Sequence, residues 1–504
     1  MSGEHWSGHI KVDSNQWGVG HGGFFTQSIS IYPTFGKITK KDGKECASAN
    51  KINFVYDCGR VHFNQSNVDD SLRKAIDEYI CSLSSTESNI DLLVISHFDK
   101  DHYSGLKFLK QQADEKGITI DKVWVPAVDI GEVIRLIGSW YSDESGSDNP
   151  PDFWHKLEQF NDTIHGLFDE SVIQEVNRSS GGEYDDDSRI TGVSDGATYD
   201  RTIEYSEEHG ARVTLRTHNK QKQVLWEVCP YFPAYVQDVV HDRQFINGIA
   251  KLFGPSYPNL PTEILITNLL AGDYKITDTE SDEKIDILKR HFGELTKEAR
   301  RKWGAQLKKD WESRKAKLGK EEKKNYTVHV SIGSGGGTIT NITSLCLYSG
   351  PVGGSAEWEF DRAIFRRNVL SEYKYSKRDK HSWLGTGDAV FVDQPDINAL
   401  IQTIAQQKMN RISVVSAPHH GSWNNSRDGF WDRKTFPNLE FATIEGEKHD
   451  TLTNHECMEQ KVKEIGGSVF VASSDNHIEW IDILSNCPCN EPRALRRYLQ
   501  QLFS

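Results

Sequence analysis

The first 130 residues contain short apolar runs that predict strands, separated by amphipathic stretches that predict helices. The strand candidates combine β-branched and aromatic residues between Gly, Pro or polar loops, and they span residues 24–35, 51–59, 91–96 and 118–126. Helical spacing of apolar residues is found over 69–84 and 103–116. This alternation is typical of folds in which sheets and helices form layers.

The pattern changes in the middle of the chain. Residues 142–152 and 179–200 are polar, acidic and rich in Gly and Ser, which predicts exposed loops. Around them we expect a helix near 153–170, a hairpin near 211–232 and a long basic helical region over 283–324. We therefore interpret residues 131–330 as an insertion or accessory region.

Apolar runs return in the last third of the chain. Strands are predicted at 343–350, 389–393, 412–418, 439–446, 467–474 and 478–484, and helices at 397–409 and 454–465. The expected organisation is therefore a domain whose first half is 1–130 and whose second half, with a C-terminal tail, is 331–504.

The composition indicates a soluble globular protein. Of the 504 residues, 37% are hydrophobic and 13 are Trp, which is too apolar for a disordered chain. No run approaches the roughly 20 apolar residues of a membrane span, and the opening MSGEHWSGHIKV lacks the apolar core of a signal peptide. We expect a cytoplasmic protein without a membrane contact, and its eight scattered cysteines are expected to be reduced thiols.

The charge is unevenly distributed. A net charge of −14 argues against a general nucleic-acid coat, yet residues 289–324 carry 14 Lys and Arg against 6 Asp and Glu. This stretch predicts either contact with a phosphate backbone, through Arg300, Arg301 and Lys308, or a solvated helix face. A second basic patch over 362–380 either holds substrate phosphates or keeps a loop soluble; its candidate residues are Arg366, Arg367 and Lys374.

Metal-capable side chains are densest in His97-Phe98-Asp99-Lys100-Asp101-His102, directly after the predicted strand 91–96. Such a loop can direct His97 and Asp99 to one ion while Asp101 and His102 bind a neighbouring ion. Two further clusters, Asp388 and His419-His420, also stand beside predicted strands. Three strand-end clusters of this kind favour a site for two divalent ions, which can share a hydroxide and hold a phosphoryl or acyl group.

These motifs resemble the metallo-β-lactamase superfamily, whose signature is HxHxDH, a later Asp and a final His. They are more similar to the hydrolase domain of the competence protein ComEC and its relatives, which have HxDxDH, an N-x-x-S strand, TGD and PHHGS. The corresponding residues here are His97–His102, Asn341–Ser344, Thr386–Asp388 and Pro418–Ser422. The turn at 18–23 resembles the family's VGQGD turn, with His21 and Gly23 in place of Gln and Asp, and 56–59 resembles its IDxG strand end.

The resemblance covers about residues 10–130 and 330–485 and implies an αββα sandwich with a large helical insertion, its site lying on the shared edge of two sheets. The implied metal ligands are His97, Asp99, Asp101, His102, Asp388, His419 and Asn341, the last in place of a histidine. This mixture of oxygen and nitrogen ligands suits two Zn²⁺ or Mn²⁺ ions. Asp57 is expected either to orient a ligand or to cap the backbone at its strand end.

The implied reaction is hydrolysis of a phosphodiester by a hydroxide between the ions, which attacks phosphorus in line. Besides Asp101, catalytic roles are assigned to His420 and His449, either of which is a candidate to protonate the leaving oxygen. Our leading hypothesis is a nuclease acting on DNA or RNA, as an effector in a bacterial defence system. One alternative is hydrolysis of a small phosphodiester. Another is a partner-gated subunit whose insertion docks on a protein such as an NTPase of a defence system.

Overall fold

The computed structural model describes the chain in separate ranges. They are residues 8–33, 40–41, 44–45, 50–85, 88–126, 153–176, 190–192, 200–206, 210–216, 222–231, 344–351, 359–366, 369–376, 381–391, 397–398, 400–401, 404, 406–423, 425–446 and 455–486.

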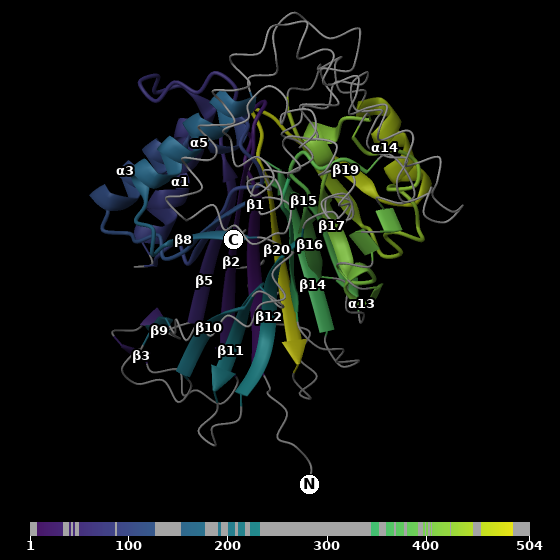
Figure 1. Ribbon diagram of the computed structural model, residues 1–504. Helices are drawn as coiled ribbons and strands as arrows, with labels where there is room; N and C mark the ends of the chain where they lie inside the picture. Colours follow the sequence, from purple (N-terminus) through teal and green to yellow (C-terminus); the bar gives the residue numbers. More distant parts are fainter. Residues whose placement is uncertain are drawn as a thin grey trace, which may run out of the picture.

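Two nine-stranded sheets form the centre of the molecule (Figure 1). In spatial order, the first sheet consists of β15 (Val369–Ser376), β14 (Glu359–Arg366), β20 (Ile478–Asn486), β1 (Gly8–Gln16), β2 (Phe24–Pro33), β5 (Asn50–Cys58), β6 (Leu92–Val94), β7 (Val123–Pro126) and β8 (Ile173–Val176). The second consists of β19 (Ser468–Ala472), β18 (Phe441–Glu445), β17 (Ile412–Ser416), β16 (Ser382–Gly385), β13 (Cys346–Pro351), β12 (Lys222–Tyr231), β11 (Gly210–Arg216), β10 (Asp200–Ser206) and β9 (Ile190–Gly192). A short hairpin pairs β3 (Lys40–Lys41) with β4 (Lys44–Glu45).

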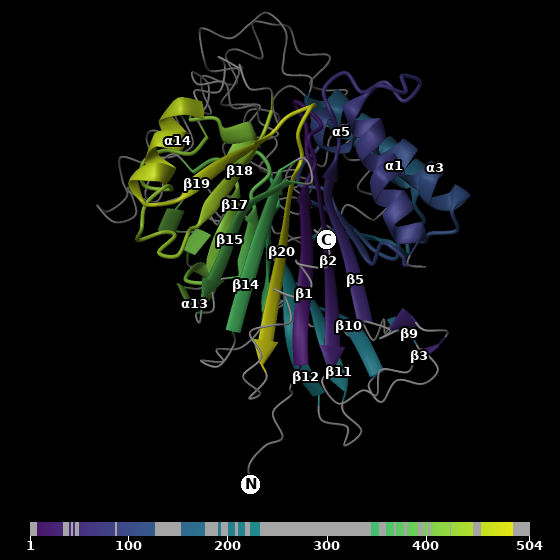
Figure 2. The same ribbon diagram turned by 180° about the vertical axis from the view of Figure 1, so that it is seen from behind.

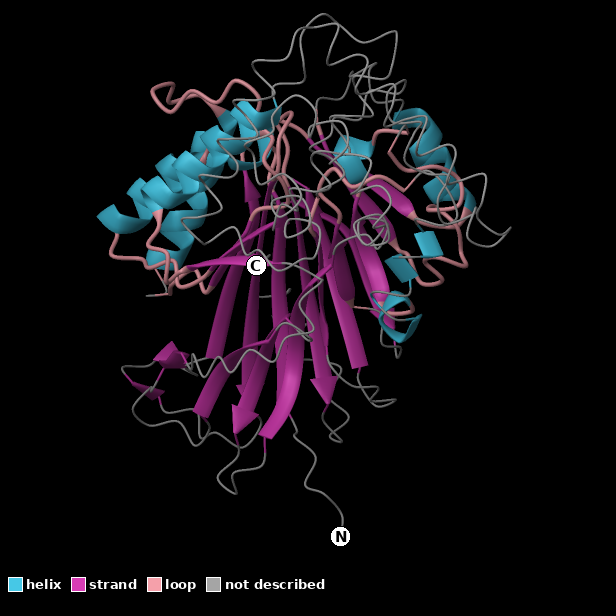
Figure 3. Ribbon diagram, in the orientation of Figure 1, coloured by secondary structure: helices cyan, strands magenta, loops and turns pink. Residues whose placement is uncertain are grey.

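Helices lie on both outer sides of the paired sheets, as Figures 2 and 3 show. On the side of β5 to β8 they are α1 (Ser71–Ser84), α2 (Lys100–Tyr103), α3 (Leu106–Glu115) and α5 (Phe153–Leu167); on the side of the second sheet they are α13 (Gln406–Met409) and α14 (His455–Glu464). The predicted αββα sandwich is therefore confirmed. None of the helices in the described ranges has both the length and the apolar character of a membrane span.

Local sequence explains why α1 begins where it does. Asp70 is its N-cap and accepts hydrogen bonds from the backbone N–H groups of Leu72 and Arg73, which have no partner inside the helix. The buried residues of α1 recur at helical spacing, so that one face packs against the sheet. They are Leu72, Ala75, Ile76, Tyr79, Ile80 and Leu83.

The main core fills the space between the two sheets. Phe25 of β2 stacks on Trp383 of β16, with ring centroids 4.0 Å apart, and Trp480 of β20 lies 5.4 Å from Phe441 of β18. All four rings are almost fully buried. Because each pair joins one sheet to the other, this core fixes how the strand ends of the two sheets meet.

Most predicted elements are confirmed, but there are differences. Residues 190–192, within the stretch 179–200 that was predicted to be an exposed loop, form the strand β9, and the strand β1 was not predicted. The apolar run 389–393 is not a strand: within its described part, Phe391 makes an isolated bridge to Ser426, and the strand β16 comes before Asp388 instead. The second basic patch, interpreted from sequence as a phosphate-binding or solubilising segment, contains most of the antiparallel pair β14 and β15.

Part of the predicted accessory region continues the two sheets. β8 pairs with β7 in the first sheet. In the second sheet β12 pairs with β11 on one side and with β13 on the other. The long basic helical region over 283–324 lies outside the described residues. The division of the chain at residues 130 and 330 stays a prediction.

Candidate metal centre

The candidate ligands lie at the carboxyl ends of parallel strands in both sheets. In the first sheet β5 runs parallel to β6, and their ends deliver Asp57 and the loop that contains His97 and His102. In the second sheet β16 runs parallel to β17, and their ends deliver Asp388 and the turn that contains His420. Because these strand ends meet across the sandwich, ligands that are about 300 residues apart in sequence come together.

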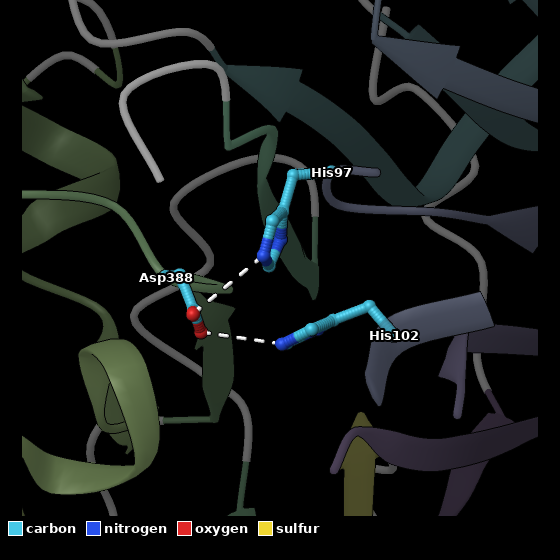
Figure 4. A group of neighbouring side chains, drawn as sticks. All are labelled: His97, His102 and Asp388. Atoms are coloured by element: carbon cyan, nitrogen blue, oxygen red, sulfur yellow. Dashed lines mark ion pairs between the residues drawn. The ribbon is translucent and has the colours of Figure 1, made fainter. Parts of the chain in front are cut away.

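His97, His102 and Asp388 form a first cluster, in which all three side chains are buried (Figure 4). The Nε2 atom of His97 lies 3.6 Å from Oδ2 of Asp388, and Nε2 of His102 lies 3.3 Å from Oδ1 of the same carboxylate. Both Nε2 atoms and this Oδ1 are buried without a hydrogen-bond partner in the described structure. Buried polar atoms are rarely left in this state, so this donor set fits a divalent cation.

Asp101, His102 and His420 form a second cluster, which shares His102 with the first. Oδ2 of Asp101 lies 3.3 Å from Nε2 of His420 and 3.9 Å from Nε2 of His102. Asp101 comes from the first sheet's loop and His420 from the second sheet's turn. Two adjoining clusters fit two neighbouring ions, with His102 available to one of them because its Nε2 has a single lone pair.

Two further predicted ligands border the first cluster. Oδ2 of Asp99 lies 3.8 Å from Nε2 of His97, and Nε2 of His419 lies 3.6 Å from Oδ2 of Asp388. His419 is the more exposed of the two, since 28% of its side chain is accessible. The structure thus brings together all the predicted ligands except Asn341, which, like the predicted catalytic His449, lies outside the described residues.

Asp57 makes contacts that fit both of the roles that the sequence left open. Its Oδ1 accepts a hydrogen bond from the backbone N–H of Ser96 at 2.6 Å, and its Oδ2 lies 2.8 Å from Nδ1 of His102. The Ser96 hydroxyl lies 2.7 Å from Asp57 Oδ2 and 3.0 Å from Nδ1 of His97. Asp57 and Ser96 therefore hold the two rings so that each Nε2 faces the cluster.

We expect the Asp57→Asn variant to bind metal about 10–100-fold more weakly, because the amide replaces one of the acceptor oxygens that orient His102. Asn tolerates the positive φ of 60° at this position, so that the backbone is preserved. Isothermal titration with Zn²⁺ measures the effect, and Asp70→Asn, a change at a buried carboxylate that caps α1, is the matched control. Equal affinity of the Asp57 variant and the wild type would contradict this role.

Two glycines let the backbone approach the ligand loop closely. A Cβ atom at position 59 would lie 2.4 Å from the backbone carbonyl carbon of Asp101, and one at position 23 would lie 3.1 Å from Nδ1 of His102. The Gly23 N–H donates to the Asp101 carbonyl at 2.9 Å, and the Gly59 N–H donates to Gly23 at 2.9 Å. The glycine turn at 18–23 therefore supports the ligand loop through its backbone.

The side chains perturb one another's protonation. Burial and the neighbouring His102 lower the pKa of His97, whereas Asp388, Asp57 and Asp101 outweigh burial and raise the pKa of His102. His419, His102 and His97 hold the pKa of Asp388 well below its usual value despite its burial. Burial raises the pKa of Glu445, at the end of β18, to about 7. Asp388, held ionised in a buried position, gives the centre a negative potential that favours cations.

The predicted phosphate-binding residues are only partly described. Arg366 is exposed at the end of β14, with its guanidinium 4.4 Å from the centre of the Phe470 ring, and Lys374 is the β15 partner of Arg362. Arg362, the first residue of that patch, is fully buried and forms ion pairs with Asp482 and Glu440. The remaining candidates, Arg300, Arg301, Lys308 and Arg367, lie outside the described residues.

Apart from Asp57, the sequence did not indicate which groups hold the candidate ligands in place. Ser96 stands inside the motif loop, but its contacts to Asp57 and His97 depend on the fold. Oδ1 of Asn425 accepts a hydrogen bond from Nδ1 of His419 at 2.8 Å, and Nδ2 of Asn425 donates to the Asp388 carbonyl at 3.0 Å. Glu445 faces Nδ1 of His420. The one feature of the sequence that could have indicated these residues is their position as polar residues near a strand end or beside a histidine motif.

Comparisons with known proteins find little similarity. No family model matches the sequence, and no curated protein matches it. Among solved structures, a long-form RNase Z from yeast has a TM-score of 0.18 and 11% identity, covering 38% of this chain and 21% of that one. YhfI from Bacillus subtilis, a metallo-β-lactamase-fold protein, has a TM-score of 0.15 and 13% identity, covering 42% of this chain and 61% of that one. The chain therefore spans less than two thirds of either structure, and the fold assignment rests on its own strand order and layers.

Proposed function

We propose that this protein is a metal-dependent hydrolase with two divalent cations, and that its substrate is a phosphodiester in DNA or RNA. The observation that carries the metal proposal is the first cluster, where three buried polar atoms face one another without hydrogen-bond partners. An apolar or merely structural site would not leave such atoms unpaired, because each would cost about 1–3 kcal/mol.

The residues that would hold the ions are those of the two clusters. His97 and Asp388 would hold one ion, and Asp101, His102 and His420 the other, with Asp99 and His419 beside the first; Nε2 of His102 has a single lone pair and would bind one ion only. The mixture of imidazole and carboxylate suits Zn²⁺ and Mn²⁺. Two such ions supply Lewis-acid charge and lower the pKa of water, so that hydrolysis proceeds near neutral pH.

The choice of nucleic acid as substrate rests on the sequence. The motif pattern resembles the ComEC-like branch, and the basic stretch 289–324 has the charge that contact with a phosphate backbone requires. A location in the cytoplasm, a role in bacterial defence and an NTPase partner belong to the same proposal.

Cleavage of supercoiled, linear and single-stranded DNA and of RNA, each with Mn²⁺, Mg²⁺ or Zn²⁺, tests this function. We expect cutting by the wild type that requires metal and is lost in Asp101→Ala, because this change removes a carboxylate from the second cluster. The exposed Asp114→Ala variant, on α3, is the control and should cut at the wild-type rate.

Other outcomes lead to different conclusions. Cutting that does not depend on metal, or that persists in Asp101→Ala, would contradict the proposed site. A wild type that binds metal but cuts none of these substrates would contradict a nuclease that is active without a partner. Activity on a small phosphodiester, or activity restored by a defence NTPase, would then identify the function.

A further inference from the structure

All four histidines of the centre are oriented in the same way. Each presents Nε2 to a carboxylate of the centre, while its Nδ1 faces a polar side chain behind it. The polar side chain is Ser96 for His97 at 3.0 Å, Asp57 for His102 at 2.8 Å, Asn425 for His419 at 2.8 Å and Glu445 for His420 at 3.9 Å. His420 is thus the one of these four whose Nδ1 has no hydrogen bond in the described structure.

Glu445 is held in place from the opposite sheet. It is the last residue of β18, and its carboxylate accepts a hydrogen bond from the side-chain amide of Gln16, the last residue of β1. Gln16 is fully buried, and its own carbonyl oxygen accepts hydrogen bonds from the hydroxyls of Ser416 at 3.1 Å and Thr443 at 3.4 Å. A buried amide satisfied on both sides fixes the position of the carboxylate that it binds.

The backbone brings His420 to the same place. His420 lies in the turn Pro418–Gly421 after β17, which runs parallel to β18. A Cβ atom at position 421 would lie 3.2 Å from the Ile444 side chain, so that the turn packs directly on the residue before Glu445. The φ angle of His420 is 55°, a left-handed conformation that is uncommon for a residue with a side chain. Packing of this kind maintains a conformation that costs free energy by itself.

We propose that Glu445 is a positioning residue for the second cluster: it accepts a hydrogen bond from Nδ1 of His420 and thereby directs Nε2 to the ion. This inference rests on the proposed metal function and deepens it. A histidine that binds metal through Nε2 carries its proton on Nδ1, and a carboxylate behind that proton fixes the ring and raises its basicity. The proposal requires the 3.9 Å separation between Nδ1 and Glu445 to shorten to hydrogen-bond length while Nε2, now 3.3 Å from Oδ2 of Asp101, stays directed to the centre.

Titration with cobalt(II), followed by its visible absorption and by calorimetry, tests the proposal without any substrate. In Glu445→Ala we expect affinity at the second cluster to fall about 10–100-fold while the first cluster keeps its affinity. Glu445→Gln should recover part of the loss, because its amide oxygen also accepts a hydrogen bond. Glu479→Ala, which removes a half-buried carboxylate from β20 and changes the net charge equally, should bind both ions as the wild type does.

A double-mutant cycle with His420→Ala tests whether Glu445 affects metal affinity through His420. If Glu445 acts through His420, removing it from the His420→Ala protein should cause no further loss of affinity. A further loss of the same size there, or wild-type affinity in Glu445→Ala, would overturn the proposal. A wild type that binds no ion would overturn both this inference and the proposed function. Binding of two ions without cleavage would contradict the nuclease proposal alone, and the cycle would still decide the role of Glu445.

Discussion

The Asp388→Ala variant is expected to lose the first ion and all metal-dependent activity. This carboxylate lies within 3.6 Å of both His97 and His102, and its removal leaves two buried imidazoles without the anionic group between them. The loss of affinity should exceed the roughly 10–100-fold that removal of an outer partner causes, because Asp388 is itself a ligand candidate. Calorimetric titration with Zn²⁺ and the cleavage assay measure the two effects.

Two controls separate this effect from unfolding or a general change of charge. Circular dichroism should show an unchanged fold, since Asp388 contributes no apolar surface to the core. Asp428→Ala removes an exposed carboxylate that pairs with Lys461 and should leave metal affinity unchanged. If Asp388→Ala bound Zn²⁺ as tightly as the wild type, the first cluster would not be a metal site.

The Arg362→Ala variant is expected to have a free energy of unfolding about 3–5 kcal/mol lower than that of the wild type. The buried guanidinium makes two hydrogen bonds to Asp482, at 2.6 and 2.8 Å, and one to Glu440, at 2.9 Å. Its loss leaves Asp482, itself buried, without its cationic partner. Burial already raises the pKa of Asp482 in spite of Arg362, so the unpaired carboxylate would be costly.

Urea unfolding of the metal-free protein measures this loss. Arg366→Ala, on the same strand, removes an exposed guanidinium that lies over Phe470, and should cost at most about 1 kcal/mol. Replacing the pair together, as Arg362→Met with Asp482→Leu, should recover much of the stability because no buried charge remains unpaired. A loss below about 1 kcal/mol in Arg362→Ala would show that this buried ion pair contributes little to the stability of the fold.

The position of the histidine and aspartate motifs at strand ends could be predicted from the sequence because each motif is local. A strand, a tight loop and its histidines are close in sequence, and the periodicity of apolar residues identifies the strand. The groups behind the ligands could not be found in this way. Gln16 and Glu445 are far apart in the chain, and only the pairing of β1 and β18 with their own sheets brings them together.

Two of the differences in secondary structure have clear physical reasons. Ala389, Val390 and Phe391 form an apolar run because they are buried in a loop, where Phe391 stacks on Phe430 at 4.7 Å. In β14, Arg362 and Ile364 share the face toward the second sheet, so that a charged residue occupies a core position. An inward arginine breaks the alternation of apolar and polar residues by which a strand is recognised.

The sharing of the centre between the two sheets links ion binding to the stability of the whole sandwich. Asp101 and His420 approach each other from opposite sheets, so an ion bound between them connects the two halves of the fold. A ligand that binds only the folded chain stabilises it by mass action, by about 2.7 kcal/mol when its free concentration is 100 times its dissociation constant. The melting temperature of this protein should therefore rise with free metal concentration. In a cell, the folded fraction would depend on the available metal as well as on temperature.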